Sequence, residues 1–139
     1  MVKWQQYDAP DNLRYHKEHT WVRAEGPLIL VGLTDFAQQL AGEISYVDLP
    51  EEGDEIVKDR PMGKVETGKW VGKLYAPVTG SVEALNEAVL SDPAAINKEP
   101  YARGFLLKVR PSGQDPLAGL LDARAYVAAM QAKKAELKL

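Results

Sequence analysis

The sequence contains no cysteine, and this excludes disulfide bonds, thiolate metal sites and cysteine catalysis. Histidine is scarce as well, with only two in the chain, His16 and His19. They are three positions apart, and no further metal ligands stand near them at a usable spacing, so we expect no metal site. A Ser-His-Asp set, a nucleotide-binding loop and paired acidic residues at catalytic spacing are also lacking. The pattern therefore predicts a protein without catalytic residues, that is, not an enzyme.

Long apolar runs and a strong excess of one charge are missing too. No run approaches the roughly 20 apolar residues of a membrane span, and residues 1–11 resemble neither a signal peptide nor a transit peptide. The chain has 17 basic and 20 acidic residues and a formal net charge of -3, so no basic field is present to hold nucleic acid or an acidic membrane. We expect a cytoplasmic protein with neither of these partners.

What the chain does contain is a succession of short apolar stretches separated by turns. Its 139 residues suit one domain. Strands are expected near residues 13–25 and at Leu28 to Leu33. A helix of about two turns should follow, capped by Thr34 and ended by Gly42. Its apolar stripe is predicted to consist of Phe36, Ala37 and Leu40.

From Gly42 to Val109 the pattern is mainly β. Short strands are predicted at residues 44–49, 62–66, 74–76, 81–85 and 104–109, with a short helix beginning at Ser91-Asp92-Pro93. This spacing is typical of an all-β sandwich or barrel. Beyond Ser112 the character changes. A helix is predicted to begin at Pro116, and Asp122 is predicted to cap a second helix that contains Tyr126 and Met130.

We therefore divide the chain into an N-terminal extension, a β domain and a C-terminal helical segment. These cover residues 1–12, 13–111 and 112–139. The C-terminal segment either packs on the domain or binds a partner. We expect it to pack, because its apolar positions form a stripe.

The segment that is most informative about function runs from Gly63 to Gly80. One strand leads to Thr67-Gly68 and a second leads away through Leu74. Gly68 can adopt positive φ and so suits a tight reversal. This places Lys69 at a hairpin tip, away from the core. A lysine at such a tip is ordinarily a solubilising surface residue, and its identity alone does not distinguish that role from modification of the amine.

The spacings around Lys69 resemble those of a lipoyl domain. Lipoyl domains of 2-oxo acid dehydrogenases have an E-T-D-K-A hairpin followed by an A-P-V-x-G turn. The corresponding residues here are Glu66-Thr67-Gly68-Lys69-Trp70 and Ala76-Pro77-Val78-Thr79-Gly80. The proline lies eight residues after Lys69 and the last glycine eleven, as in those domains. A biotin carrier shares this hairpin, but biotin carriers place methionines beside the lysine, and Met62 is too distant.

A wider resemblance, from about Tyr15 to Ala128, is to the H protein of the glycine cleavage system. The family's E-H-x-W-V start corresponds to Glu18 to Val22, and its G-x-T-D-x-A-Q segment to Gly32 to Gln38. Its G-x-I-x-x-V-x-L-P segment corresponds to Gly42 to Pro50. Asn97 to Val109 match its last motif, with Phe105 in place of tryptophan. The resemblance implies a mainly β, lipoyl/biotinyl-type flattened β-barrel (a hybrid-motif sandwich) with short helices and a C-terminal helix.

The chain departs from the family pattern just after the lysine. H proteins usually read E-S-V-K-A there and continue with small polar residues. This chain has bulky Trp70 and then Gly72-Lys73. That form resembles the lipoate-binding proteins of the heterodisulfide-reductase-like sulfur-oxidation system, and we favour this subgroup. The alternative is an H protein that carries the aminomethyl group of glycine cleavage. A remote alternative is an unmodified homologue.

The resemblance implies a lipoyl carrier whose lipoate is attached covalently to Lys69. The arm would act as a swinging arm that carries a sulfur-bound intermediate between enzymes, as a transport protein does. Expected partners are a lipoate ligase or lipoyl-assembly enzymes, and either a heterodisulfide-reductase-like complex or the glycine cleavage enzymes. We expect a monomer. The lack of cysteine is either chance or a means of avoiding exchange with the dithiol.

Four neighbours of Lys69 are assigned to the cofactor site with it: Glu66, Thr67, Gly68 and Trp70. Glu66 is either a recognition feature for the lipoylating enzyme, which the resemblance favours, or a strand surface charge. Trp70 has three interpretations: packing over the hairpin, contact with a partner, or cover for the dithiolane. A nearby acidic loop is either solvated or an electrostatic docking patch; it contains Asp48, Glu51, Glu52, Asp54 and Glu55.

Overall fold

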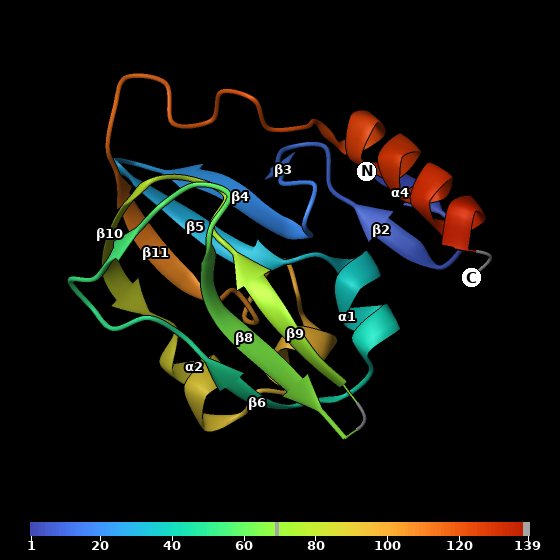
Figure 1. Ribbon diagram of the computed structural model, residues 1–139, viewed down its shortest axis with the longest axis horizontal. Helices are drawn as coiled ribbons and strands as arrows, with labels where there is room; N and C mark the ends of the chain where they lie inside the picture. Colours follow the sequence, from blue (N-terminus) through green and yellow to red (C-terminus); the bar gives the residue numbers. More distant parts are fainter. Residues whose placement is uncertain (69, 138–139) are drawn as a thin grey trace.

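The computed structural model describes residues 1–68 and 70–137, and of residues 135–137 it describes the backbone alone. It is mainly β, with antiparallel sheets, short helices and one longer helix near the C-terminus (Figure 1). The mainly β class predicted from the sequence is confirmed. The fold consists of two sheets that enclose a core, with an aromatic cluster to one side that joins both ends of the chain.

The larger sheet has six strands in the order β3-β4-β5-β11-β10-β7. Their bounds are Arg14–Tyr15 for β3, Thr20–Glu25 for β4, Leu28–Leu33 for β5, Leu107–Pro111 for β11, Gly80–Leu85 for β10 and Glu55–Ile56 for β7. Neighbouring strands in this sheet run antiparallel. Because β5 pairs with β11, segments 76 to 80 residues apart in the sequence lie side by side in its centre.

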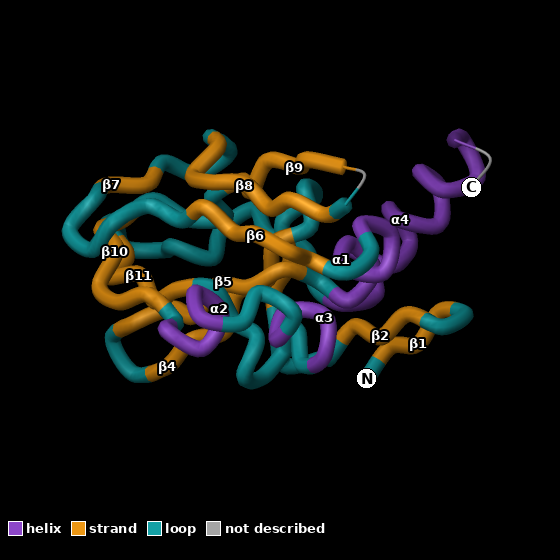
Figure 2. The backbone as a smooth tube through the Cα atoms, turned by 90° about the horizontal axis from the view of Figure 1, so that it is seen from below, coloured by secondary structure: helices purple, strands orange, loops and turns teal. Residues whose placement is uncertain are grey.

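The smaller sheet has three strands in the order β6-β8-β9, and it contains the hairpin of interest. Here β6 is Ile44–Asp48, β8 is Pro61–Thr67 and β9 is Trp70–Tyr75. Val47 and Val65 pair directly across β6 and β8 and point inward, at 6% and 1% exposure. Figure 2 shows this sheet on one side of the molecule and β4, β5 and β11 on the other.

The main core fills the space between the sheets. Val31 and Val109 come from the larger sheet, Val65 and Leu74 from the smaller one, and all four are almost completely buried. Alternating burial along β9 and β10 is the consequence of the period-two geometry of a strand. The core fixes the register of both strands of the hairpin, because a slip by one residue would turn the inward side chains of Val65 and Leu74 to solvent.

Four helices complete the fold of the described residues: α1 (Asp35–Ala41), α2 (Glu87–Ser91), α3 (Ala95–Lys98) and α4 (Ala123–Leu137). The caps predicted for α1 are confirmed. Thr34 accepts a hydrogen bond from the Ala37 N–H, and Gly42 ends the helix at φ 87°. Asp122 likewise accepts from the Ala125 N–H at the start of α4.

Residues 1–12, for which no structure was predicted, form a two-stranded hairpin, β1 (Val2–Trp4) and β2 (Tyr7–Ala9). Its aromatic rings pack on α1, with Trp4 and Tyr7 centroids 5.4 and 4.9 Å from that of Phe36. Lys134 of α4 lies over both rings of the hairpin and donates to Gln5 and Tyr7. Both ends of the chain therefore meet beside α1. The division at residues 12 and 111 stays a prediction.

Three local predictions were wrong. Leu40 is 48% exposed and does not belong to the buried face of α1; Phe36 of the predicted stripe is buried, and the other buried residues of the helix are Asp35, Gln38 and Ala41. The helix assigned to Ser91-Asp92-Pro93 begins at Ala95, and α2 precedes it, capped by the Asn86 side chain. No helix begins at Pro116, where the described chain runs through turns before α4.

Candidate functional site

The candidate site is the end of the β8–β9 hairpin. The strands reach it as the pair Thr67↔Trp70, and Gly68 between them is exposed. Lys69, the residue assigned as the lipoyl attachment point, lies outside the described residues. Its chain neighbours are nevertheless placed. Thr67 Oγ1 lies 3.5 Å from the Trp70 carbonyl oxygen, so the described part of the turn is tight.

Gly68 does not use the conformation that was expected of it. Its φ is not among the positive values found at Gly26, Gly42 and Gly53. A Cβ at Gly68 would meet nothing within 4 Å. The role predicted for this glycine, a reversal through positive φ, is therefore wrong, and its backbone leaves open space on this side of the turn.

Trp70 folds back along its own strand. Trp70 and Gly72 point to the same face of β9 because they are two residues apart, and the indole ring lies where a Cβ of Gly72 would stand. The ring remains 49% exposed. Of the three interpretations of Trp70, packing over the hairpin is therefore what the geometry shows. It also explains why glycine occurs at position 72: a larger residue there would displace the indole ring.

A hollow of about 390 Å³ lies beside Trp70, lined also by His19, Ala37, Leu40 and Ala41. Its wall is mostly apolar, and α1 supplies three of the five residues. A second hollow of about 470 Å³ borders Thr67 and Gly68 and is lined by Gly42, Glu43 and Ser45 as well. Ala41 contributes to both. The hairpin end is therefore flanked by two recesses, and the walls of both are mostly apolar.

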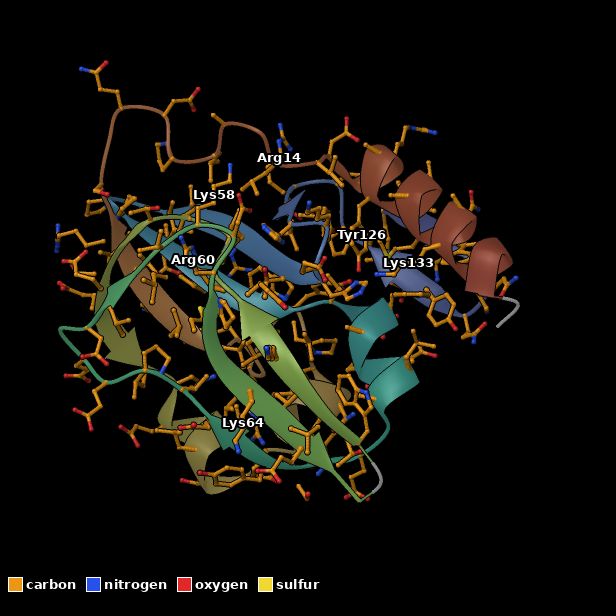
Figure 3. All side chains as sticks on the ribbon, in the orientation of Figure 1. Arg14, Lys58, Arg60, Lys64, Tyr126 and Lys133 are labelled. Carbon is orange, nitrogen blue, oxygen red and sulfur yellow. The ribbon has the colours of Figure 1, made fainter. Side chains whose placement is uncertain are left out.

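The outer face of the smaller sheet carries a row of exposed side chains next to the site. Tyr46, Glu66 and Val71 are direct partners across β6, β8 and β9, so they share one face. Tyr46 is 50% and Val71 59% exposed. Glu66 is paired with Lys64 at 3.7 Å on the same strand. Figure 3 shows Lys64 on β8. Glu66 thus stands in an accessible, partly apolar surface close to Lys69 in the sequence.

His19, which was dismissed as a metal ligand, is held in an unusual position at the wall of the apolar hollow. Its φ is 81°, in the region that non-glycine residues rarely adopt. Its Nδ1 lies 3.1 Å from the Tyr126 hydroxyl oxygen, and that oxygen lies 2.8 Å from Thr34 Oγ1. Figure 3 shows Tyr126 and Lys133 between α4 and the β domain.

Electrostatics keep His19 uncharged. Burial, reinforced by the positive charge of Lys133 and by His16 against the opposing effect of Glu18, lowers the pKa of His19 to about 4. The imidazole is therefore neutral near pH 7. Sequence reasoning missed His19 and Tyr126 as members of the site. The only signal was the position of His19 in the Glu18 to Val22 motif, while the contact with a helix 107 residues later could not be foreseen.

The acidic loop lies away from the hairpin end. Asp54 accepts a hydrogen bond from the Glu51 N–H at 2.9 Å, so one of its carboxylates serves the turn itself. Asp48, Asp54 and Glu55 line a shallow groove together with Arg60. Its use as a docking patch stays a prediction. Across residues 1–68 and 70–137 no group of three potential metal ligands is found, and no helix is long and apolar enough to span a membrane.

Comparison with known proteins settles the family. The family described as Glycine cleavage H-protein matches residues 13–133. The chain belongs to this family. Among H proteins, the chain is similar to the glycine cleavage system H protein of Anaeromyxobacter sp. (strain K), with 43% identity over 121 residues that cover 87% of this chain and 94% of the relative. With the H protein of Bacillus licheniformis it shares 44% identity over 118 residues, covering 85% and 93% of the two chains.

A solved structure agrees. The chain is similar to the crystal structure of a glycine cleavage system H protein from Mycobacterium marinum, with a TM-score of 0.81 and 32% identity. The match covers 88% of this chain and 98% of that one. H proteins are non-catalytic and carry lipoate covalently on a lysine. The chain is therefore a lipoyl carrier and not an enzyme, as the sequence predicted, and the flattened lipoyl-type fold is confirmed.

The preference for the sulfur-oxidation subgroup gains no support from these comparisons. The relatives from Anaeromyxobacter and Bacillus are glycine cleavage H proteins, which favours the interpretation that was kept as the alternative. The expected partners divide in the same way. Enzymes of lipoyl attachment and of glycine cleavage follow from the family, while a heterodisulfide-reductase-like complex does not.

Proposed function

We propose that this protein is the carrier subunit of a glycine cleavage system and that its lipoyl group is attached to Lys69. The observation that supports this most is the combination of H-protein family membership over residues 13–133 with the position of Lys69 between β8 and β9. When bound, lipoate supplies a dithiol and disulfide pair through which an aminomethyl group passes between enzymes.

The chain's own residues suit such an arm. The main core holds β8 and β9 in register, so their ends at Thr67 and Trp70, on either side of Lys69 in the sequence, are held together. Next to the turn lies an apolar hollow of about 390 Å³ with His19 in its wall. A dithiolane ring is apolar, and a hollow with one polar side chain matches it. The protein thereby delivers and orients the group, and tethering keeps the group at a high effective concentration near each partner enzyme.

Glu66 is the residue we propose as a recognition feature for the enzyme that attaches lipoate. It lies three residues before Lys69, in the accessible row with Tyr46 and Val71. Glu66→Gln removes its charge and keeps its shape, so lipoylation should slow severalfold. Glu83→Gln is the matched control, because Glu83 is also an ion-paired, partly exposed glutamate on a strand. Equal lipoylation rates for both variants would contradict the proposal.

A second candidate function is transport of a sulfur-bound intermediate in sulfur oxidation. One observation favours it: no carboxylate lines the described hollow beside Trp70, whereas an aminomethyl group is cationic at neutral pH and would gain from one. This observation concerns the cargo and does not alter the identity of the carrier.

The two functions are separated by loading experiments with the lipoylated protein. In one, the protein is incubated with glycine and a pyridoxal-phosphate-dependent glycine decarboxylase. In the other, it is incubated with an inorganic sulfur donor under reducing conditions. We expect the mass increase of an aminomethyl group in the first reaction. A mass increase only in the second reaction would overturn the glycine cleavage proposal and favour sulfur transport.

A further inference from the structure

The N-terminal hairpin, residues 2–9, is attached to the protein from outside its two sheets. Figure 2 shows β1 and β2 to one side of these sheets, and the two strands pair only with each other. The hairpin also lies outside residues 13–133, the part of the chain that the H-protein family matches. A two-stranded hairpin is at best marginally stable alone in water. Its structure therefore depends on the surface against which it docks, and we call it the strap.

The strap is bonded to the first turn of α1. The Asp8 N–H donates to the Asp35 carboxylate at 2.8 Å, and the Tyr101 hydroxyl donates to the Asp8 carbonyl oxygen at 2.6 Å. The same hydroxyl oxygen accepts from the Asp35 N–H at 2.9 Å. Tyr7 and Phe36 add an edge-to-face contact between buried rings. When the strap is closed, it therefore satisfies polar groups and covers an apolar ring at the start of α1.

The other end of α1 is held in a different way. The Asn97 side-chain amide donates to the Gln38 side-chain oxygen at 2.9 Å and to the Gly42 carbonyl oxygen at 2.8 Å. Its oxygen accepts from the Ile44 N–H at 2.9 Å. None of these four residues belongs to the strap. The two ends of α1 thus have separate attachments, and the first end is the one that the strap holds.

Lys134 of α4 contacts the strap from the other side. Its Nζ lies 5.4 and 5.0 Å from the ring centroids of Trp4 and Tyr7. It also donates to the Gln5 side-chain oxygen at 3.0 Å and to the Tyr7 hydroxyl oxygen at 3.3 Å. Two aromatic faces and two acceptors therefore attract one ammonium group. Earlier in the same helix, Tyr126 is buried against β3 of the β domain, so α4 is also anchored without the strap.

We propose that the strap opens and closes over α1 as a unit of its own, that Lys134 fastens it, and that closure holds the first turn of α1 in place. Segments at chain ends open with lower free energies than the core of a fold. Ala37 in that first turn lines the hollow beside Trp70, so the strap also steadies one wall of the carrier site. The proposal goes beyond the proposed function and does not depend on lipoate at Lys69.

The test is native-state hydrogen exchange of single amides, followed by NMR in the unmodified protein. Lys134→Met removes the ammonium group and keeps an unbranched apolar side chain, so the packing of the lysine stem is retained. The open state of the strap should become about five- to thirtyfold more populated. Exchange of the Asp8 and Asp35 amides should accelerate by this factor. Exchange at Gly42, at the end of α1, and at Val65 in the central strand β8 should stay the same.

Lys133→Met is the matched control. It removes the same charge from the neighbouring position of α4, and the hydrogen bonds and ring contacts of the described residues that join α4 to the strap come from Lys134 and not from Lys133. Exchange in the strap should therefore be unchanged in this control. Trp4→Leu opens the strap by another route. Lys134→Met should have a smaller effect in that background, because one of the two rings under the ammonium group is gone.

The pattern of exchange distinguishes the parts of the proposal. Unchanged exchange at Asp8 in Lys134→Met would overturn the role of Lys134 as the fastener. Acceleration at Asp8 without acceleration at Asp35 would overturn the hold of the strap on α1. Equal acceleration at Asp8, Gly42 and Val65 would show that the whole domain opens at once, and the strap would then not be a separate unit. The proposed attachment of lipoate to Lys69 is unaffected by any of these results.

Discussion

The contact between Trp70 and Gly72 predicts that Gly72→Ala destabilises the protein when Trp70 is present and stabilises it when Trp70 has been replaced by alanine. In Gly72→Ala the new Cβ would occupy the place of the indole ring, so the ring must turn away. Trp70 is 49% exposed, so about half of its surface is packed. Half of the ~150–250 Å² that a buried aromatic removes from water corresponds to at most about 3 kcal/mol at ~25 cal/mol per Å².

The net effect should be smaller than this maximum. The displaced ring can find other contacts, and alanine stabilises a strand relative to glycine by about 0.4–1 kcal/mol when no clash occurs. We therefore expect Gly72→Ala to lower the free energy of unfolding by about 1–2 kcal/mol in the original protein. In a Trp70→Ala background the same change should raise the free energy of unfolding by about 0.4–1 kcal/mol, because the atoms nearest to the new Cβ all belong to the ring that has been removed.

The assay is urea unfolding followed by circular dichroism for the four members of this double-mutant cycle. Gly68→Ala is the control, because a Cβ at Gly68 meets nothing within 4 Å and should change little. If Gly72→Ala destabilised the protein equally with and without Trp70, the ring would not be the group that requires glycine, and the reasoning would be refuted.

Three further predictions concern His19, the pair of His16 with Asp59, and the helix cap Asn86. The pKa of His19 is about 6.5 in the unfolded chain and about 4 in the folded chain. The unfolded chain therefore binds the proton first, and His19 should make the free energy of unfolding fall as pH decreases from about 6.5 to about 4. A His19 ring that titrates near 6.5 by NMR would contradict this. The hydrogen bond from His16 lowers the pKa of Asp59 below its ordinary 3.8, so its stabilisation exists above that value and disappears as pH falls through the folded pKa. Asp59→Asn should flatten this part of the stability curve, and an unchanged curve would count against the pair. Asn86 caps α2 and donates to the Arg103 and Phe105 carbonyl oxygens. Asn86→Ala should therefore lower the free energy of unfolding by about 2–4 kcal/mol, against about 1 kcal/mol for Asp122→Ala at an exposed cap. Equal losses in urea unfolding would show that the two carbonyl contacts contribute nothing.

The sequence was sufficient to predict those features that depend only on neighbouring residues, such as helix caps and hairpin strands. Thr34 and Asp122 were identified as caps because a side-chain oxygen at such a position satisfies nearby N–H groups. The strands around Lys69 followed from alternation and turn residues. Leu40 was misassigned because helical period alone does not say which face meets the core, and here the N-terminal hairpin, α3 and α4 decide it.

The contacts that define the hollow are nonlocal, and this is why the sequence did not reveal them. Tyr126 reaches His19 only because α4 packs across the beginning of the β domain. The coupling of Trp70 to Gly72 had a local signal, since residues two apart in a strand share a face. The sequence analysis interpreted Trp70 and Gly72 as the mark of a subgroup with other partners. The structure shows that packing of the indole ring over Gly72 explains at least part of this pair.

The measurement that tests the central claim most directly is intact mass spectrometry of the protein after treatment with a lipoate ligase, lipoate and ATP. Lys69→Arg is the essential comparison, because it keeps the positive charge but removes the amine that forms the amide. Lys73→Arg on β9 controls for loss of any nearby lysine. We predict one lipoyl addition in the original protein and in Lys73→Arg, and none in Lys69→Arg. Full lipoylation of Lys69→Arg, or no addition to the original protein by a competent ligase, would contradict the account.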